Sequence, residues 1–326
     1  MLQSDFGRRH SYTEMRAFFT VICAGLLLFP AAVATQSPAR FRVVLLGTGN
    51  PPPLVTRFGP SILVDAGSER LLFDAGRGAL QRLRQMGVND ANRVFLTHLH
   101  SDHVVGIPDL YLTGWLMGRR QVPFSVCGPA GTTAMMNHLR EAFAFDIDFR
   151  INDDKAPPEG AQVDARDITE GVVYEANGVR VTAFDVDHRP IKPALGYRID
   201  YGGHSVVLSG DTRFNENLIA RARGADLLIH EVSAIEGQTQ ATSSVLAHHT
   251  TPEQAGKVFS RVHPTLAVYS HIVGGLTDEQ LVQMTRTTYQ GPLVVGSDLM
   301  AFDVGDSIAV YNIAGVSALG AVVPSR

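Results

Sequence analysis

The sequence predicts an α/β protein, an αββα sandwich in which two mixed β-sheets are flanked by helices. Three observations support this prediction. Short β-branched runs alternate with amphipathic helical patterns from Phe41 onward, the elements fall into two halves, and many strands end in polar loops. No low-complexity linker separates the halves, so we predict one domain over residues 41–315.

Composition limits the possible functions. The chain has 326 residues, of which 45% are hydrophobic and 18% charged, enough to bury a sizeable core. The formal net charge is −4, so we expect no broad basic surface for nucleic acid and no binding of DNA.

The first forty residues are typical of an export signal. Arg8, Arg9 and Arg16 precede the apolar run AFFTVICAGLLLFPAAVA, which ends in an A-x-A type cleavage site at Ala34. A membrane anchor is the alternative, although Pro30 interrupts the run. We predict a cleaved signal peptide over residues 1–34 and a periplasmic or extracellular location.

The first half of the remaining chain begins with three strands separated by glycines. They are FRVVLLGTG, SILVDAG and LLFDAG, and the amphipathic helix GALQRLRQMGV follows. The strand RVFLTHLH then runs into a histidine-rich loop. FSVCGP predicts a further strand and TTAMMNHLREAF a helix.

Two hairpins are predicted in the middle of the chain. The turn Asn177-Gly178 separates two alternating runs, and Gly202-Gly203 does the same between GYRIDY and HSVVL. Helices and strands then alternate again, through ENLIARARG, ADLLIHEV, TPEQAGKVFSRV, LAVYSHI, TDEQLVQMTRTTY and PLVVGSDLMAF.

The segment THLHSDH, residues 97–103, carries the main chemical signal. Side chains alternate along a strand, so His98 and His100 are expected to point the same way and share one metal ion. The chain then turns, which lets Asp102 and His103 face a second ion. Imidazole nitrogen and carboxylate oxygen are both zinc ligands.

This H-x-H-x-D-H motif, together with the order of the strands, resembles the metallo-β-lactamase superfamily over most of the chain from Phe41 onward. The resemblance implies a site for two Zn²⁺, although other divalent metals are possible. It also implies that His188, Asp211 and His271 complete the ligand set, with Asp211 bridging both ions.

The resemblance implies a role for three further residues. Asp74 would support the metal loop by hydrogen bonding, and its alternative role is that of a turn residue. Glu231 and His249 resemble a pair of the tRNase Z-like branch and its relatives, in which the carboxylate keeps the imidazole protonated to donate to a leaving oxygen. Alternatively, Glu231 only ends a strand and His249 only precedes a helix. We expect the catalytic residues to be Asp102, Glu231 and His249.

Two zinc ions close together lower the pKa of a bridging water and supply hydroxide at neutral pH. The site therefore predicts hydrolysis without selecting the electrophile. A non-catalytic metal-binding module is a further alternative, which the complete set of ligand positions disfavours.

The branch is predicted from longer stretches. GTGNPPP, RFGPSILVDAG, LTGWLMGR, CGPAGT and HHTTPEQAG resemble the metallo-β-lactamase-type arylsulfatases. Trp115, Leu116 and Met117 would form either ordinary core packing or an apolar wall for an aryl leaving group. We therefore expect hydrolysis of small-molecule sulfate or phosphate esters, arylsulfatase-like first.

A tRNase Z-like phosphodiesterase is the alternative within the same superfamily. Those enzymes carry an arm that grips tRNA, in many members between the positions of His188 and Asp211, where this chain has only a hairpin. The acidic charge and the predicted export also disfavour tRNA, so tRNA is expected to be an unlikely substrate.

Overall fold

The structure is a computed structural model of the whole chain, and it describes residues 40–235, 240–313 and 321–324. All of them belong to one unit, Ser37–Arg326. The predicted signal peptide, residues 1–34, lies outside the described residues. Among the described residues, no helix has the length and apolar character that crossing a membrane requires.

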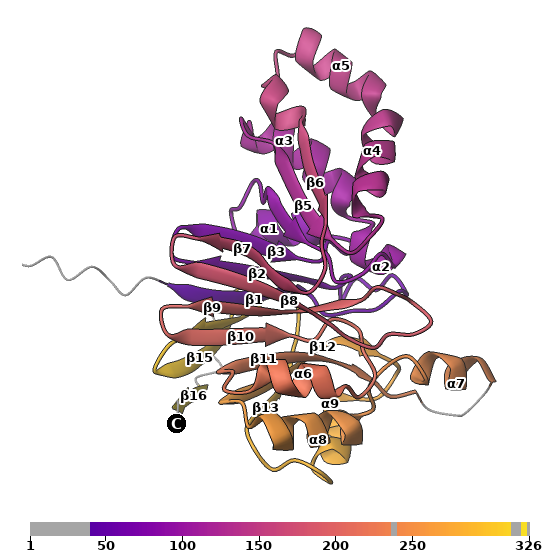
Figure 1. Cartoon of the computed structure of the whole chain (residues 1–326), viewed down its shortest axis with the longest axis vertical. Coiled ribbons are helices and arrows are strands. Elements are labelled where there is room, and N and C mark those ends of the chain that lie inside the picture. The colour runs from indigo at the N-terminus through magenta and orange to yellow at the C-terminus, as the bar shows by residue number, and fades with distance from the viewer. Residues whose placement is uncertain (1–39, 236–239, 314–320, 325–326) are drawn as a thin grey trace, which may run out of the picture. The chain divides into compact units, whose positions relative to one another are not determined.

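Two β-sheets make up the centre of this unit (Figure 1). In order across the first sheet, the described strands are β16 (Ala321–Pro324), β15 (Ser307–Asn312), β14 (Met300–Val304), β1 (Phe41–Gly47), β2 (Ser61–Ala66), β3 (Glu69–Phe73), β4 (Arg93–Phe95), β5 (Phe124–Gly128) and β6 (Val163–Asp167). Those of the second are β13 (Leu293–Val295), β12 (Leu266–Val273), β11 (Leu227–Ser233), β10 (His204–Leu208), β9 (Leu195–Tyr201), β8 (Val179–Asp185) and β7 (Gly171–Ala176).

Both sheets contain parallel and antiparallel pairs. The predicted hairpins are present: β7 and β8 meet at Asn177 and Gly178, and β9 and β10 meet at Gly202 and Gly203, all four with positive φ. Such turns match the twist of the strands that they join.

Helices cover the outer faces of both sheets (Figure 1). On the first sheet these elements are α1 (Ala79–Gln85), α2 (Ser101–Val104), the π-helix Asp109–Thr113, α3 (Gly114–Gly118), α4 (Thr132–Ala142), α5 (Ala144–Asn152) and the 3₁₀ turn Pro158–Ala161. The second half of the chain supplies α6 (Glu216–Ala222), α7 (Gln240–Leu246), α8 (Pro252–Val262) and α9 (Asp278–Thr285). Capping boxes start α8 at Thr251 and α9 at Thr277.

Three apolar layers follow from this arrangement. Strand β1 is buried on both faces: Val43 and Leu45 join the layer between the sheets, while Val44 and Leu46 face the helices of the first sheet. A third layer lies between the second sheet and its helices, where Phe259 of α8 is fully buried. The predicted αββα sandwich of two mixed sheets is confirmed.

Candidate metal centre

The histidine motif lies in a loop and a short helix rather than in a strand. Strand β4 ends at Phe95, two residues before the motif begins, so strand alternation does not explain how the first two histidines meet. They meet all the same, with 2.9 Å between His98 Nε2 and His100 Nδ1. Asp102 and His103 occupy α2, which turns them toward a second position.

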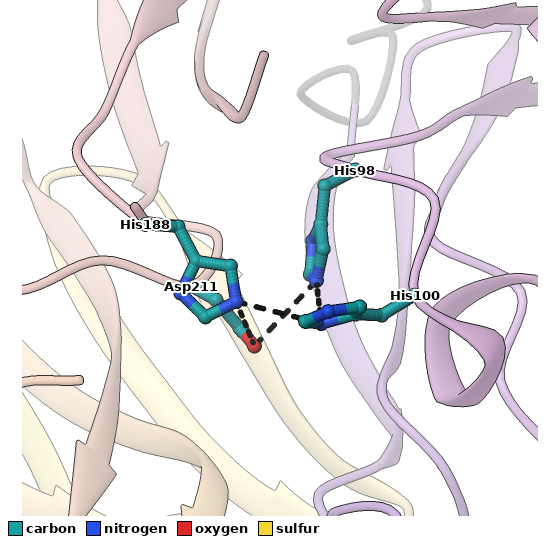
Figure 2. Close-up of side chains that lie close together, drawn as sticks. All are labelled: His98, His100, His188 and Asp211. Carbon is teal, nitrogen blue, oxygen red and sulfur yellow. Dashed lines mark hydrogen bonds and ion pairs between the residues drawn. The ribbon is translucent and has the colours of Figure 1, made fainter. Parts of the chain in front are cut away.

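Three segments far apart in the sequence bring the other predicted ligands to the same place. His188 follows β8, and Asp211 follows β10 through Gly210. Gly210 has φ +59°, and a side chain there would come within 2.5 Å of the carbonyl oxygen of Leu195, so the approach to Asp211 requires glycine. His188 and Asp211 point at His98 and His100 (Figure 2).

His271 lies within β12 rather than after the end of this strand. Glu231 pairs with Ser270 and Val232 pairs with Ile272, which leaves His271 as the extra residue of a β-bulge with φ +43°. A bulge redirects one side chain out of the regular alternation. His271 Nε2 thereby comes within 3.3 Å of Asp102 Oδ2.

The potential ligand atoms form two adjoining clusters, and a third group of Asp211, His249 and His271 overlaps them. Within each cluster all of them lie within 4.8 Å of one another: one comprises His98, His100, His188 and Asp211, the other Asp102, His103 and His271. Asp211 Oδ2 is 3.8 Å from His98 Nε2 in the first cluster. It is 3.4 Å from His103 Nε2 and 3.4 Å from His271 Nε2 in the second, so this carboxylate contacts both clusters. The buried clusters are consistent with a dinuclear metal site.

Hydrogen bonds fix which nitrogen of His98 and of His103 faces the clusters. Asp74, directly after β3, accepts a hydrogen bond from His103 Nδ1 at 2.8 Å and another from Thr97 Oγ1 at 2.9 Å. Thr97 Oγ1 has therefore used its proton and accepts from His98 Nδ1 at 3.0 Å. Asp74 thus leaves the Nε2 lone pairs of both histidines free, and Thr97 is a participant that the sequence did not reveal.

His248, a residue that the sequence analysis did not single out, orients His188 in the same way. His188 Nδ1 donates to the main-chain carbonyl of His248 at 3.0 Å, which leaves Nε2 as the acceptor nitrogen. Such partners orient metal-binding imidazoles and raise their basicity.

The electrostatics favour neutral imidazoles in the first cluster and a charged carboxylate between the two clusters. Burial lowers the pKa of His98 and of His188, and that of His98 falls well below its usual value. Burial alone would raise the pKa of Asp211, but His271 and His103 outweigh it and hold that pKa well below its usual range. His103 Nε2 and Asp211 Oδ1 are buried without a hydrogen-bond partner among the described residues, as expected of atoms that a metal would satisfy.

Glu231 and His249 lie together beside the clusters. His249 Nδ1 is 3.2 Å from Glu231 Oε2, while Glu231 Oε1 accepts hydrogen bonds from Thr250 N at 2.8 Å and Thr212 N at 3.3 Å. Burial opposes protonation of His249, but Glu231 outweighs it and raises the pKa of His249 to about 9.

The proposed aryl wall is not where the sequence suggested. Trp115 is fully buried beneath the first sheet and donates from Nε1 to the carbonyl of Pro157. Leu116 packs against the same layer and Met117 is 42% exposed, and none of the three lines the pocket beside the clusters. Core packing, the alternative for Trp115, is therefore its role.

Comparisons with known proteins agree with this architecture. A family described as the beta-lactamase superfamily domain matches residues 62–272. The ribonuclease Z of Mycolicibacterium gilvum (strain PYR-GCK) is 36% identical over 270 residues, which are 79% of this chain and 94% of that protein.

Two solved structures share the fold at low sequence identity. The human short-form tRNase Z is 21% identical, with a TM-score of 0.63 over 81% of this chain and 99% of its own. The Zn²⁺-bound PqqB from Methylobacterium extorquens is 19% identical, with a TM-score of 0.56 over 81% of this chain and 100% of its own.

The fold and the paired clusters define a metal-dependent hydrolase of the metallo-β-lactamase fold. The chain belongs to the metallo-β-lactamase superfamily, which confirms the resemblance seen in the sequence. Among its branches, the curated relatives favour ribonuclease Z over the arylsulfatases that we had placed first.

Proposed function

We propose that this protein is a metal-dependent phosphodiesterase of the ribonuclease Z type, which cleaves a phosphodiester bond in RNA. The observation that carries the proposal is the Glu231–His249 pair, since it adds a proton donor beside the two clusters. The identity of 36% to a ribonuclease Z supports the same reaction.

We further propose that the clusters bind two Zn²⁺. His98, His100 and His188 would hold one ion, Asp102, His103 and His271 the other, and Asp211 both. Imidazoles with fixed tautomers and ionised carboxylates fit zinc, which when bound supplies a water nucleophile at neutral pH and polarises the phosphoryl oxygens.

His249 acts in this proposal as the acid. Its Nδ1 faces Glu231, so Nε2 remains for a substrate oxygen. With a pKa of about 9 the imidazole is protonated at neutral pH, and it donates its Nε2 proton to the oxygen that leaves when the P–O bond breaks. Glu231 in turn is held by the backbone of Thr250 and Thr212.

In this proposal the short interval between His188 and Asp211 does not disfavour RNA. Between His188 and Asp211 the chain forms only β9 and β10. The Mycolicibacterium ribonuclease Z aligns over 94% of its own length, which leaves no room for a long arm that this chain lacks. Our expectation that tRNA is an unlikely substrate has therefore lost its structural support.

Hydrolysis of an aryl sulfate ester is the second candidate. One observation favours it: the pocket beside the clusters has apolar walls, and no lysine or arginine occurs among its described lining residues. A small aryl ester would fit such a pocket without needing further charges from the protein.

One turnover experiment separates the candidates. Zinc-loaded protein is given a precursor tRNA with a 3′ extension, bis-p-nitrophenyl phosphate and p-nitrophenyl sulfate, with His249→Ala and the surface variant His138→Ala in parallel. Cleavage of the RNA and the diester, weakened only in His249→Ala, supports the proposal. Cleavage of the sulfate alone supports the second candidate. If none of the three substrates is cleaved, the result supports the non-catalytic metal-binding module.

We also propose that residues 1–34 direct export. We propose that they are a signal peptide that is cleaved after Ala34. N-terminal sequencing of the protein purified from its own cells tests this: a chain that begins after Ala34 supports cleavage, and one that retains residues 1–34 overturns it. An exported enzyme would meet RNA outside the cytoplasm. Its proposed substrates would then be other RNA diesters and not precursor tRNA.

A further inference from the structure

We propose that the pocket beside the metal clusters is a subsite for an uncharged, planar aromatic group of the ester substrate, such as a nucleobase or an aryl ring. The identity of the ester rests on the proposed function, whereas the subsite rests on the pocket itself. Its volume is about 600 Å³, within the range typical of small-molecule sites, so it accommodates one or two residues of a nucleic acid chain.

Potential ligands and apolar side chains both line this pocket. The potential ligands are His100, Asp102, His188, Asp211 and His271, and His249 also lines the pocket. The apolar side chains come from four separate segments and are Pro51, Pro52, Leu54, Ile235, Val245 and Val273. A group bound against them therefore lies next to the scissile bond.

The lining favours an uncharged group over a second anion away from the clusters. Its carboxylates, Asp102 and Asp211, belong to the clusters. No described residue of the lining is a lysine or arginine that could neutralise another phosphate. An uncharged ring has a smaller desolvation cost here than an anion and gains contact with exposed apolar surface.

The wall formed by Pro51, Pro52 and Leu54 is held in place before any substrate binds. Gly49 N donates to Phe58 O at 2.7 Å and closes the base of the loop. The Asp298 carboxylate accepts hydrogen bonds from Thr48 N at 3.0 Å and Phe58 N at 2.7 Å. Because both ends are held, half-exposed Leu54 lies in a loop whose base is closed rather than in a free segment.

Proline rings and aliphatic side chains are suited to a flat ring. Leu54 is 50% exposed and Val245 37% exposed, so a bound ring would cover apolar surface that now faces water. The two residues lie on separate segments, the loop after β1 and helix α7, and both line the pocket.

Equilibrium binding to the zinc-loaded protein tests the subsite without turnover. Isothermal titration calorimetry compares diphenyl phosphate with dimethyl phosphate, two diesters that share one charge and differ in their rings. We expect the wild type to bind diphenyl phosphate at least about tenfold more tightly. The variants Leu54→Ser and Val245→Ser should each lose about fivefold or more of diphenyl phosphate affinity and leave that for dimethyl phosphate unchanged.

Val122→Ser is the matched control, because Val122 is 51% exposed on a loop outside the pocket. Equal affinities for the two diesters, or losses in the pocket variants no larger than in the control, would overturn the subsite. Failure of the proposed function is a separate result, namely no cleavage of RNA or of bis-p-nitrophenyl phosphate, and it would leave a measured preference for aromatic diesters intact.

Discussion

Glu231 and His249 form a buried pair, with 3.2 Å between Glu231 Oε2 and His249 Nδ1. They approach from β11 and from the loop before α8, and each side chain is no more than 11% exposed. Of the groups around His249, Glu231 does most to stabilise the imidazolium.

The pair predicts a pH dependence that Glu231→Gln should change. Protonated His249 is present below its pKa of about 9 and is lost as the pH rises through that value, so kcat should fall there. Without the carboxylate, burial lowers the pKa of His249, and the fall should move down by about one pH unit or more. The measurement is kcat for bis-p-nitrophenyl phosphate against pH.

Glu279→Gln is the control for this profile, because Glu279 is exposed on α9. It should leave the basic limb at its wild-type position. A basic limb that stays unmoved in Glu231→Gln as well would contradict the role of the pair.

Asp74→Asn should weaken metal binding although Asp74 is not itself a proposed ligand. Asp74 Oδ2 accepts from both His103 Nδ1 and Thr97 Oγ1, and Oδ1 accepts from Thr97 N at 2.8 Å. Whichever way an amide is turned, its NH₂ group faces a donor and the negative charge is lost, so the support for both tautomers weakens. Loss of such a partner typically costs about 10–100-fold in metal affinity. Zinc affinity measured by chelator competition checks this.

Asp167→Asn provides the comparison, since Asp167 ends β6, outside the clusters, and accepts backbone hydrogen bonds from Gly131 and Thr133 at the start of α4. Its zinc affinity should equal that of the wild type. Wild-type affinity in Asp74→Asn would mean that the tautomers are fixed by other contacts.

The sequence was sufficient to predict elements whose signals are local. The two hairpins follow from Asn177-Gly178 and Gly202-Gly203, and the start of α8 follows from its Thr-Pro capping pattern. The H-x-H-x-D-H spacing likewise places its ligands within one loop and one turn of helix, so no distant contact is needed to bring them together.

Other features depend on pairing between distant segments. The bulge that turns His271 into the site exists only because β11 and β12 shift register, which neither strand reveals alone. Trp115 is a core residue because the Pro157 carbonyl, 42 positions away, accepts its indole hydrogen. The actual apolar wall combines Leu54 with Val245, and no local pattern joins those two residues.

Asp211→Ala should reduce zinc content from about two ions per chain to about one or fewer. The Oδ2 atom contacts histidines of both clusters, so its loss removes a ligand from each proposed ion. Emission spectroscopy after dialysis measures the ratio, and Asp109→Ala, remote from the clusters, should retain two. Two tightly held ions in Asp211→Ala would contradict a bridging role.

Asp298→Asn should destabilise the fold, because one carboxylate joins three segments. It accepts from the Thr48 hydroxyl at 2.9 Å and from Arg82 Nη2 at 2.9 Å, besides the two backbone bonds at the ends of the loop. The side chains of Asp298 and Arg82 are 5% and 14% exposed, so breaking the pair should lower the free energy of unfolding by about 2 kcal/mol. Urea unfolding of metal-free protein measures this.

Asp65→Asn is the control for this prediction. It should lower the free energy of unfolding by only about 0.5 kcal/mol, since its partner Arg70 is 44% exposed and water screens that pair. Equal losses in the two variants would show that Asp298 acts as an ordinary surface charge and does not hold the loop.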